Sequence, residues 1–400
     1  MIARLRPVIG MGEWLALLGP APVDSVQRYE RGFAELMEQG HAVAFPYGRT
    51  GLAFLLEALG IRGMEVICPA YTCVVVAHAI VQSGNEPVFV DCSEGDYNMD
   101  LNLAEGAIGD RTGAVVATSI FGYPVDLDRL DDVTRRHPKI PVIQDCAHSF
   151  AATWKGRPVQ RAGQASIFGS NISKLITSIF GGMVTTDDEV IANRLRALRA
   201  ERCLRPSMFK GMRRRVYLAA ANVALSPVLY GMTHALERRG VLGGLVDYYD
   251  EGSIEMPSDF LDGTTPIEGR IGCAQVAAYP RIVAHRRKTA DFYRERLAGI
   301  DGLVPPPVIE GATYSHCVFR VGSEKREALL AFARARGVQL GTVIDYCVPS
   351  MRAYRERLGA RFEYTRAEQF ASEVVNLPLW VDEGNAVRVA AAVRAFFTKQ

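Results

Sequence analysis

The sequence has no large excess of charge of either sign. Its 46 lysine and arginine residues nearly balance 44 aspartate and glutamate residues, which leaves a formal net charge of +2. Proteins that bind nucleic acids or anionic membranes over a broad surface need a strong positive field. We therefore expect no nucleic acid partner, and any basic surface must be local. With 48% hydrophobic and 22% charged residues, the composition also excludes a disordered or fibrous chain.

Paired cysteines are also missing. None of the eight cysteines forms a C-x-x-C pair, and all of them are scattered through apolar segments. This pattern predicts reduced core cysteines in a cytoplasmic protein, with neither a disulfide framework nor a metal site. The sequence also lacks internal repeats and low-complexity tracts, and its 400 residues favour two domains or one large domain with a smaller partner.

Between residues 47 and 186, short β-branched runs alternate with helical patterns, which is typical of a parallel sheet covered by helices. The expected strands are 65–68, 87–90, 114–119, 141–144, 165–168 and 183–185, and the expected helices are 51–59, 72–82 and 127–135. Thr50 and Asp126 are the expected helix caps. Ligands of such sheets lie beyond the carboxyl ends of the strands.

The α/β rhythm predicts a large domain over 1–278 and a smaller C-terminal α/β domain over 279–400. The smaller domain is expected to hold helices 283–297, 325–336 and 385–397 and a strand at 315–321. The rhythm fails over 203–258, which predicts an insertion there.

The expected insertion contains an unusual uncharged run. Residues 216–236 include no Asp, Glu, Lys or Arg, and they lie between Arg213-Arg214-Arg215 and Arg238-Arg239. A membrane-spanning helix needs about 20 apolar residues, but Asn222, Pro227 and His234 make this run too polar. Two interpretations stay open. The insertion packs on its own subunit or across a dimer, or residues 204–239 form a peripheral helix on an anionic membrane.

Two residues could carry chemistry at the edge of the expected sheet. Asp145 ends the apolar strand 141–144, where its carboxylate serves either as a helix cap or as the partner of a cation. Lys174 lies among apolar and small residues, and a partly buried amine with a lowered pKa can attack a carbonyl group. Most lysines are merely solvated, but the pair favours catalysis.

A third element is a possible phosphate site. Gly48-Arg-Thr-Gly51 follows a turn and opens a helix, where free amides, the Thr50 hydroxyl and small glycines suit a phosphate group. An ordinary capped turn would explain the same residues.

Together these elements resemble the DegT/DnrJ/StrS family of sugar aminotransferases, which are pyridoxal-phosphate enzymes of fold type I. The segments that carry the resemblance are Gly48-Arg-Thr-Gly-Leu52, Val66-Ile-Cys-Pro-Ala-Tyr-Thr72, Pro87-Val-Phe-Val-Asp91, Val142-Ile-Gln-Asp-Cys-Ala-His148, the Lys174 loop ending in Gly181-Gly182, Ile271-Gly-Cys-Ala-Gln275, the helix with Arg286-Arg287, Tyr314-Ser-His316 and Asn376-Leu-Pro-Leu379. The most specific feature is D-x-A-H followed by a lysine 29 residues after the aspartate. The resemblance covers most of the chain outside the insertion.

The resemblance implies a seven-stranded, mostly parallel sheet, a homodimer and pyridoxal 5'-phosphate as cofactor. Lys174 would bind the cofactor covalently and move the proton between donor and cofactor, while Asp145 would face the pyridine nitrogen. His148 would lie near the phenolic oxygen, unless it is only a satisfied polar residue at a strand end. Thr50 and Gly51, with Ser170, would hold the phosphate. The implied reaction moves an amino group from an amino acid, with glutamate expected, to a nucleotide- or lipid-linked keto-sugar.

Three positions depart from the family pattern. Cys73 stands where many relatives have an aromatic residue that stacks on the cofactor, so Tyr71 or another residue must supply that face. Gly169, next to Ser170, stands where the family usually has serine, and 260–264 replaces the N-Y-R-M segment that contacts the phosphate across the dimer. Two alternative functions remain. One is a PLP-dependent sugar dehydratase, although relatives of that kind carry histidine in place of the lysine; the other is a non-catalytic binding or regulatory protein.

Overall fold

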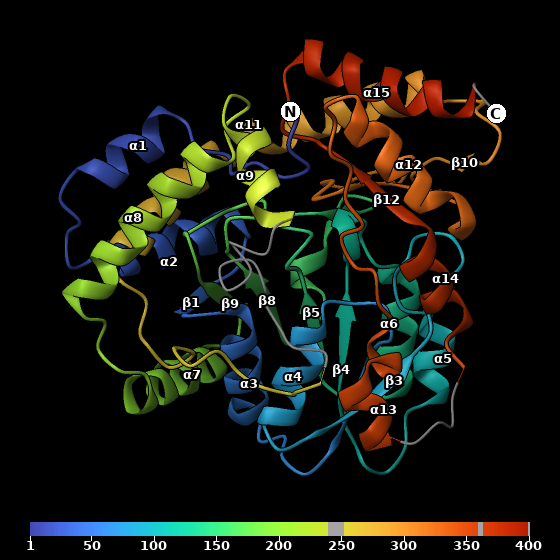
Figure 1. The fold of residues 1–400 in the computed structure, drawn as a ribbon. Helices are drawn as coiled ribbons and strands as arrows, with labels where there is room; N and C mark the ends of the chain where they lie inside the picture. Colours follow the sequence, from blue (N-terminus) through green and yellow to red (C-terminus); the bar gives the residue numbers. More distant parts are fainter. Residues whose placement is uncertain (239–251, 359–362, 399–400) are drawn as a thin grey trace.

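The computed structural model describes residues 1–238, 252–358 and 363–398 (Figure 1). Its centre is a seven-stranded sheet with the strand order β1-β9-β8-β5-β4-β2-β3. The strands are β1 (His41–Phe45), β2 (Glu65–Pro69), β3 (Glu86–Val90), β4 (Thr112–Thr118), β5 (Val142–Asp145), β8 (Ala165–Gly169) and β9 (Gly182–Thr186). Only β9 runs antiparallel to its neighbours. The predicted mostly parallel sheet of seven strands is confirmed.

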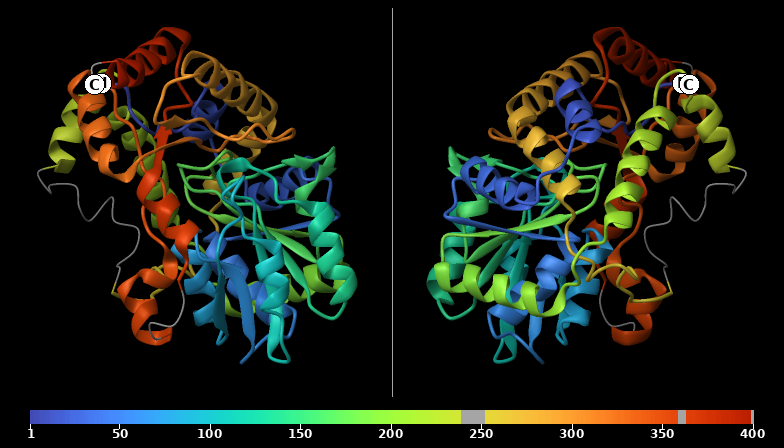
Figure 2. Two further views of the ribbon diagram at one scale, coloured as in Figure 1. Left: turned by 90° about the vertical axis from the view of Figure 1, so that its right-hand side faces the viewer. Right: turned by 90° about the vertical axis from the view of Figure 1, so that its left-hand side faces the viewer.

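Hydrophobic side chains cover both faces of this sheet, as is usual for parallel strands. One face packs against α3 (Gly48–Ala58), α4 (Val74–Gln82) and α7 (Glu189–Arg202). The other packs against α2 (Ser25–Leu36), α5 (Leu101–Gly106), α6 (Leu127–Arg136) and α11 (Pro266–Arg296). Every residue of β4 is buried, and the sheet forms the middle layer of the large domain (Figure 2).

Of the two expected caps, one is confirmed and one is wrong. The Asp126 carboxylate accepts hydrogen bonds from the amides of Asp128 and Arg129 at the start of α6. Thr50 lies inside α3, because that helix begins at Gly48 after the extended residue Tyr47. The glycine-containing segment 48–51 does open a helix, as predicted.

A smaller three-stranded antiparallel sheet lies in the C-terminal part of the chain. It consists of β10 (Leu303–Val304), β11 (Cys317–Val321) and β12 (Val374–Leu377). The helices of this part are α12 (Ser323–Ala335), α13 (Arg352–Leu358), α14 (Thr365–Glu373) and α15 (Glu383–Phe397). The predicted domain boundary at 278–279 falls inside α11, which runs unbroken from one part of the chain to the other. The division into two domains stays a prediction.

The expected insertion begins with two helices. These are α8 (Met208–Ala224) and α9 (Tyr230–Arg238), separated by a turn at 225–229 that contains Pro227. The rest of the expected membrane segment, including Arg239, lies outside the described residues. Within the described part of the chain, no helix is both long and apolar enough to cross a membrane. In Figure 1, α8 lies beside α1 (Met11–Leu18).

The basic triplet before the uncharged run mainly serves intramolecular contacts. Arg214 is buried, pairs with Glu268 at 3.1 Å and Asp259 at 3.0 Å, and stacks on Phe180. Arg215 donates hydrogen bonds to the carbonyl groups of Leu17 and Gly19. Two of the three arginines therefore make contacts within the chain. This weakens the interpretation of residues 204–239 as a peripheral membrane helix, because that interpretation needs arginines that face the lipid.

The buried ion pair generates a prediction about stability. Removing one partner of a buried pair leaves an uncompensated charge, so Arg214→Ala should lower the free energy of unfolding by about 3–5 kcal/mol. Arg213→Ala is the matched control, because Arg213 is 57% exposed and lies 3.7 Å from Asp259; its loss should cost less than about 1 kcal/mol. Urea unfolding measures both, and equal losses would contradict this assignment.

Candidate active site

A cavity of about 390 Å³ lies beyond the carboxyl ends of β4, β5 and β8. Its wall combines residues of the large sheet with residues of the C-terminal part, such as Ser315 and Asn376. Its size is within the range of small-molecule sites. The position agrees with the rule that ligands of parallel sheets bind at this edge.

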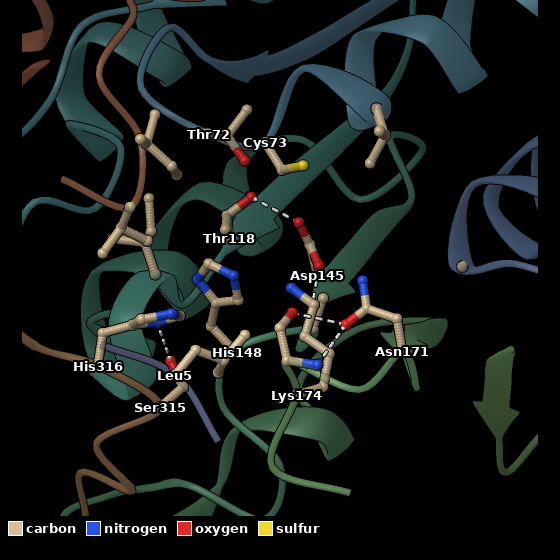
Figure 3. Close-up of a pocket in the computed structure, with 18 of the residues that line it drawn as sticks. Leu5, Thr72, Cys73, Thr118, Asp145, His148, Asn171, Lys174, Ser315 and His316 are labelled. Carbon is tan, nitrogen blue, oxygen red and sulfur yellow. Dashed lines mark hydrogen bonds between the residues drawn. The ribbon is translucent and has the colours of Figure 1, made fainter. Parts of the chain in front are cut away.

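Asp145 is the last residue of β5 and faces this cavity (Figure 3). One carboxylate oxygen accepts the amide of Ala147 at 3.0 Å, and the other accepts the Thr118 hydroxyl at 3.3 Å. Burial raises the pKa of Asp145, while the Ala147 amide and the nearby Lys174 oppose that rise. Asp145 therefore fills both roles considered from the sequence, since it fixes the turn after β5 and presents a carboxylate to a ligand.

Lys174 lies on a loop that is held in place on both sides. Its own amide donates to the carbonyl of Asn171 at 3.1 Å. The Ser170 amide bonds to the carbonyl of Gly181 at 2.8 Å, which closes the loop, and the Thr177 amide bonds to Gln275 at 3.1 Å. The Lys174 amine lines the cavity near Asp145 (Figure 3), and desolvation lowers its pKa. This favours the neutral amine that attack on a carbonyl requires.

His148 lies next to this pair and is neutral. Burial, with Lys174 and His316 nearby, holds the pKa of His148 well below its usual value. Its Nδ1 atom accepts the amide of Phe121 at 3.3 Å, so the proton of the neutral ring is on Nε2. The ring centre of His316 lies 5.1 Å from that of His148. The side chain therefore offers one hydrogen-bond donor.

The N-terminus of α3 forms another part of the wall, through Gly48 and Arg49. Gly182 packs so closely against this turn that a Cβ atom at residue 182 would lie 2.3 Å from the amide nitrogen of Gly48. The close approach brings the backbone amides of a helix start to the cavity, and such amides bind phosphate groups.

The remaining predicted cofactor residues differ in their placement. Cys73 lines the cavity, whereas the other four are not among its lining residues: Thr50, Gly51, Tyr71 and Ser170. The Thr50 hydroxyl donates to the carbonyl of Phe260, and the Tyr71 hydroxyl donates to that of Ile344. Ser170 is buried beside the Tyr29 hydroxyl at 3.3 Å. Their contacts with a cofactor stay predictions.

Positive charge dominates the cavity wall, which the sequence did not reveal. Among the described residues, four arginines and the Lys174 amine line it against one carboxylate, that of Asp145. The arginines are Arg4, Arg6, Arg49 and Arg286. Arg4 and Arg6 come from the N-terminal segment, which has no recognisable motif, and Arg286 had only been noted as part of a helix. Such a wall favours anionic ligands.

Comparison with known proteins agrees with this geometry. The model of the DegT/DnrJ/EryC1/StrS aminotransferase family matches residues 9–226 and 265–394. The chain belongs to this family. The unmatched residues between the two stretches begin later than the insertion expected at 203–258, so α8 lies within the matched part.

Individual relatives show what the chain is similar to. It is 37% identical over 202 residues to the L-glutamine:scyllo-inosose aminotransferase of Streptomyces griseus, covering 50% of this chain and 47% of that protein. It is 34% identical over 189 residues to the GDP-perosamine synthase of Caulobacter vibrioides, covering 47% and 50%. These matches therefore span about half the length of each relative.

The fold extends over the whole chain. The crystal structure of the aminotransferase TlmJ from Streptoalloteichus hindustanus superposes with a TM-score of 0.78 at 24% identity, over 100% of this chain and 99% of that one. The predicted fold-type-I architecture is confirmed.

Proposed function

We propose that the protein is an aminotransferase that moves an amino group from an amino acid to a keto-sugar. The observation that carries the proposal is the meeting of Lys174 and Asp145 in one buried cavity at the carboxyl edge of the sheet. Family membership supports the reaction class, and it assigns pyridoxal 5'-phosphate as the cofactor.

The residues of the cavity fit this cofactor. It is an aromatic aldehyde with a phosphate, a phenolic oxygen and a pyridine nitrogen, and when bound it withdraws the electrons left behind as a proton leaves the donor Cα. The wall offers an amine for the aldehyde, a carboxylate for the pyridine nitrogen and a helix N-terminus for the phosphate. Cys73 in place of an aromatic leaves one ring face without a stacking partner at that position.

Lys174 would bind the cofactor covalently through Nζ. The free amine of Lys174 would also be placed to take the Cα proton of the donor and to release it again. Burial lowers the pKa of Lys174, which favours the neutral amine that accepts a proton.

Asp145 and His148 would contact different atoms of the cofactor. The Asp145 carboxylate would hold a proton at the pyridine nitrogen, and this positive charge would favour the ionised carboxylate, whose pKa burial raises. His148 would donate its Nε2 proton to the phenolic oxygen, since Nδ1 is occupied by the Phe121 amide.

The substrates are proposed at the level of chemical class. The two relatives are named for L-glutamine with scyllo-inosose and for GDP-perosamine. We propose glutamate or glutamine as the donor, and a keto-sugar, nucleotide- or lipid-linked, or a cyclic polyol ketone as the acceptor. The four arginines of the wall support anionic substrates.

We further propose a homodimer formed through an apolar surface on α1 and α8. Its exposed side chains are Met11, Leu15, Leu18, Met208, Phe209, Met212 and Val216. Hydrogen bonds from Arg215 to the chain at the end of α1 hold the two helices together. A large contiguous apolar surface is typical of a subunit interface.

Light scattering after size-exclusion chromatography tests the dimer. The protein should have twice the mass of one chain, and Phe209→Glu should shift it towards the monomer because a charge would enter the apolar interface. Val308→Glu is the control, because Val308 is equally exposed but belongs to the segment between β10 and β11. A monomeric wild-type protein would contradict the proposal.

The proposed reaction is tested with the loaded protein and one amino acid at a time. Glutamate or glutamine should convert the cofactor to its pyridoxamine form, which is followed by the loss of visible absorbance. Lys174→Ala should abolish this conversion, because the described residues of the wall include no other lysine. Lys155→Ala is the control, since Lys155 is exposed and pairs with Asp128. Failure of the wild-type protein with both amino acids would favour the non-catalytic alternative.

The role of Asp145 predicts a separate effect on rate. Asp145→Asn keeps the shape and removes the charge, so the donor half-reaction should slow by about a hundredfold or more while the cofactor stays bound. Asp96→Asn, which changes a partly buried aspartate outside the cavity, should leave the rate within about twofold. Near-normal stopped-flow kinetics for Asp145→Asn would remove Asp145 from this role.

A further inference from the structure

Arg286 is a buried cation that has no acidic partner among the described residues. Its side chain is 4% exposed, although it lines the cavity. Nη1 donates to the carbonyl of Ser315 at 2.7 Å, whereas Nε is buried without a hydrogen-bond partner. Burial lowers the pKa of Arg286 to about 10, so the group is still charged at neutral pH. A buried unpaired charge is costly, and an anionic ligand would remove that cost.

A second arginine lines the same cavity. Arg4 belongs to the N-terminal segment, which is fixed by a bridge between Ile2 and Val338 and by a hydrogen bond from the Arg4 amide to Gln339. None of the ion pairs within the described ranges includes Arg4. Both arginines influence His316, where their charge, that of Lys174 and above all burial hold the pKa well below its usual value. His316 is therefore neutral, and the arginines supply the positive charge.

A short series of contacts leads from Arg286 to the reacting end of the cavity. Arg286 bonds to Ser315, whose hydroxyl lies 3.0 Å from Nδ1 of His316. The His316 ring packs against His148, and His148 lies beside Lys174 in Figure 3. An anion at Arg286 would therefore share one cavity with the group that would move the proton, and the two would be linked through His316 and His148.

We propose that Arg286, assisted by Arg4, binds a carboxylate group of the amino-acid donor. This inference rests on the proposed aminotransferase function. A planar guanidinium binds a carboxylate through two parallel hydrogen bonds, and a deeply buried one suits a small anion. An α-amino acid carries its carboxylate on the very carbon that loses the proton. The phosphates of a nucleotide-linked sugar lie on the far side of the sugar ring from most of its reactive carbons.

Binding of glutarate to the cofactor-loaded protein tests this subsite without turnover. Glutarate has two carboxylates and no amine, and calorimetry measures its dissociation constant. Arg286→Gln should weaken binding by about tenfold to a hundredfold, the usual range for a lost charged hydrogen bond. Arg286→Lys should recover part of the affinity, and Arg4→Gln should cause a smaller loss. Arg287→Gln is the control, because Arg287 bonds to the carbonyls of Ala312 and Gly311 and does not line the cavity.

Binding of GDP to the same variants separates a carboxylate site from a phosphate site. We expect Arg286→Gln to leave GDP affinity unchanged. Equal glutarate affinity in the wild-type protein and Arg286→Gln would overturn the proposal, as would a loss of GDP binding with glutarate binding intact. If Arg286→Gln does not fold, Arg286→Lys and Arg4→Gln replace it in the test. Both should bind glutarate more weakly than the wild-type protein and GDP equally well. Arg286-dependent glutarate binding in a protein that never converts its cofactor would support the carboxylate site and refute the aminotransferase function.

Discussion

The site depends on Asp145, which is buried, and Lys174, which is partly buried, lining the same cavity. Burial raises the pKa of Asp145 and lowers that of Lys174, which in each case disfavours the charged form. Their proximity partly offsets both shifts. Such a pair rarely adds stability compared with apolar residues, so a catalytic role explains it better than a structural one. The rigid ends of β4 and β5 and the closed loop around Lys174 hold the two groups close together.

The charge of the wall extends this argument to the ligands. With four arginines against one carboxylate among the described lining residues, the cavity is far from neutral, although the whole chain has a net charge of only +2. A phosphate-bearing cofactor and an acidic amino acid would together balance most of this charge. The neutral histidines His148 and His316 lie between the cationic groups and can donate or accept hydrogen bonds without adding charge. Distinct parts of one wall would then hold the cofactor and the donor.

Local patterns in the sequence predicted the parts of the fold that local forces decide. The β-branched runs gave six of the seven large-sheet strands to within a few residues, and the Asp126 cap was correct. Strand β1 was missed, because it lies before residue 47, where the recognised alternation of strands and helices begins, and its partner β9 is about 140 residues further along the chain. Thr50 was misplaced because α3 begins earlier, which turns its hydroxyl towards Phe260 instead of a helix start.

The residues of the site divide in the same way, into those that local motifs identify and those that only contacts between distant segments reveal. Asp145, Lys174, His148 and Cys73 could be chosen from strand ends and family motifs, and the structure brings all four to the cavity. Arg4 and Arg286 could not be given a role, because what makes them informative is burial beside segments that are distant in sequence. The pairing of Arg214 with Glu268 was hidden for the same reason, since 54 residues separate them. A run of basic residues in a sequence does not show whether its side chains face solvent.

The central claim is that Lys174 is the residue that binds the cofactor. Borohydride reduction of the wild-type protein loaded with pyridoxal 5'-phosphate, followed by peptide mass spectrometry, tests it most directly. We expect the added mass of the reduced cofactor on the peptide that contains Lys174 and on no other lysine. Modification of a different lysine, or of none, would contradict the account.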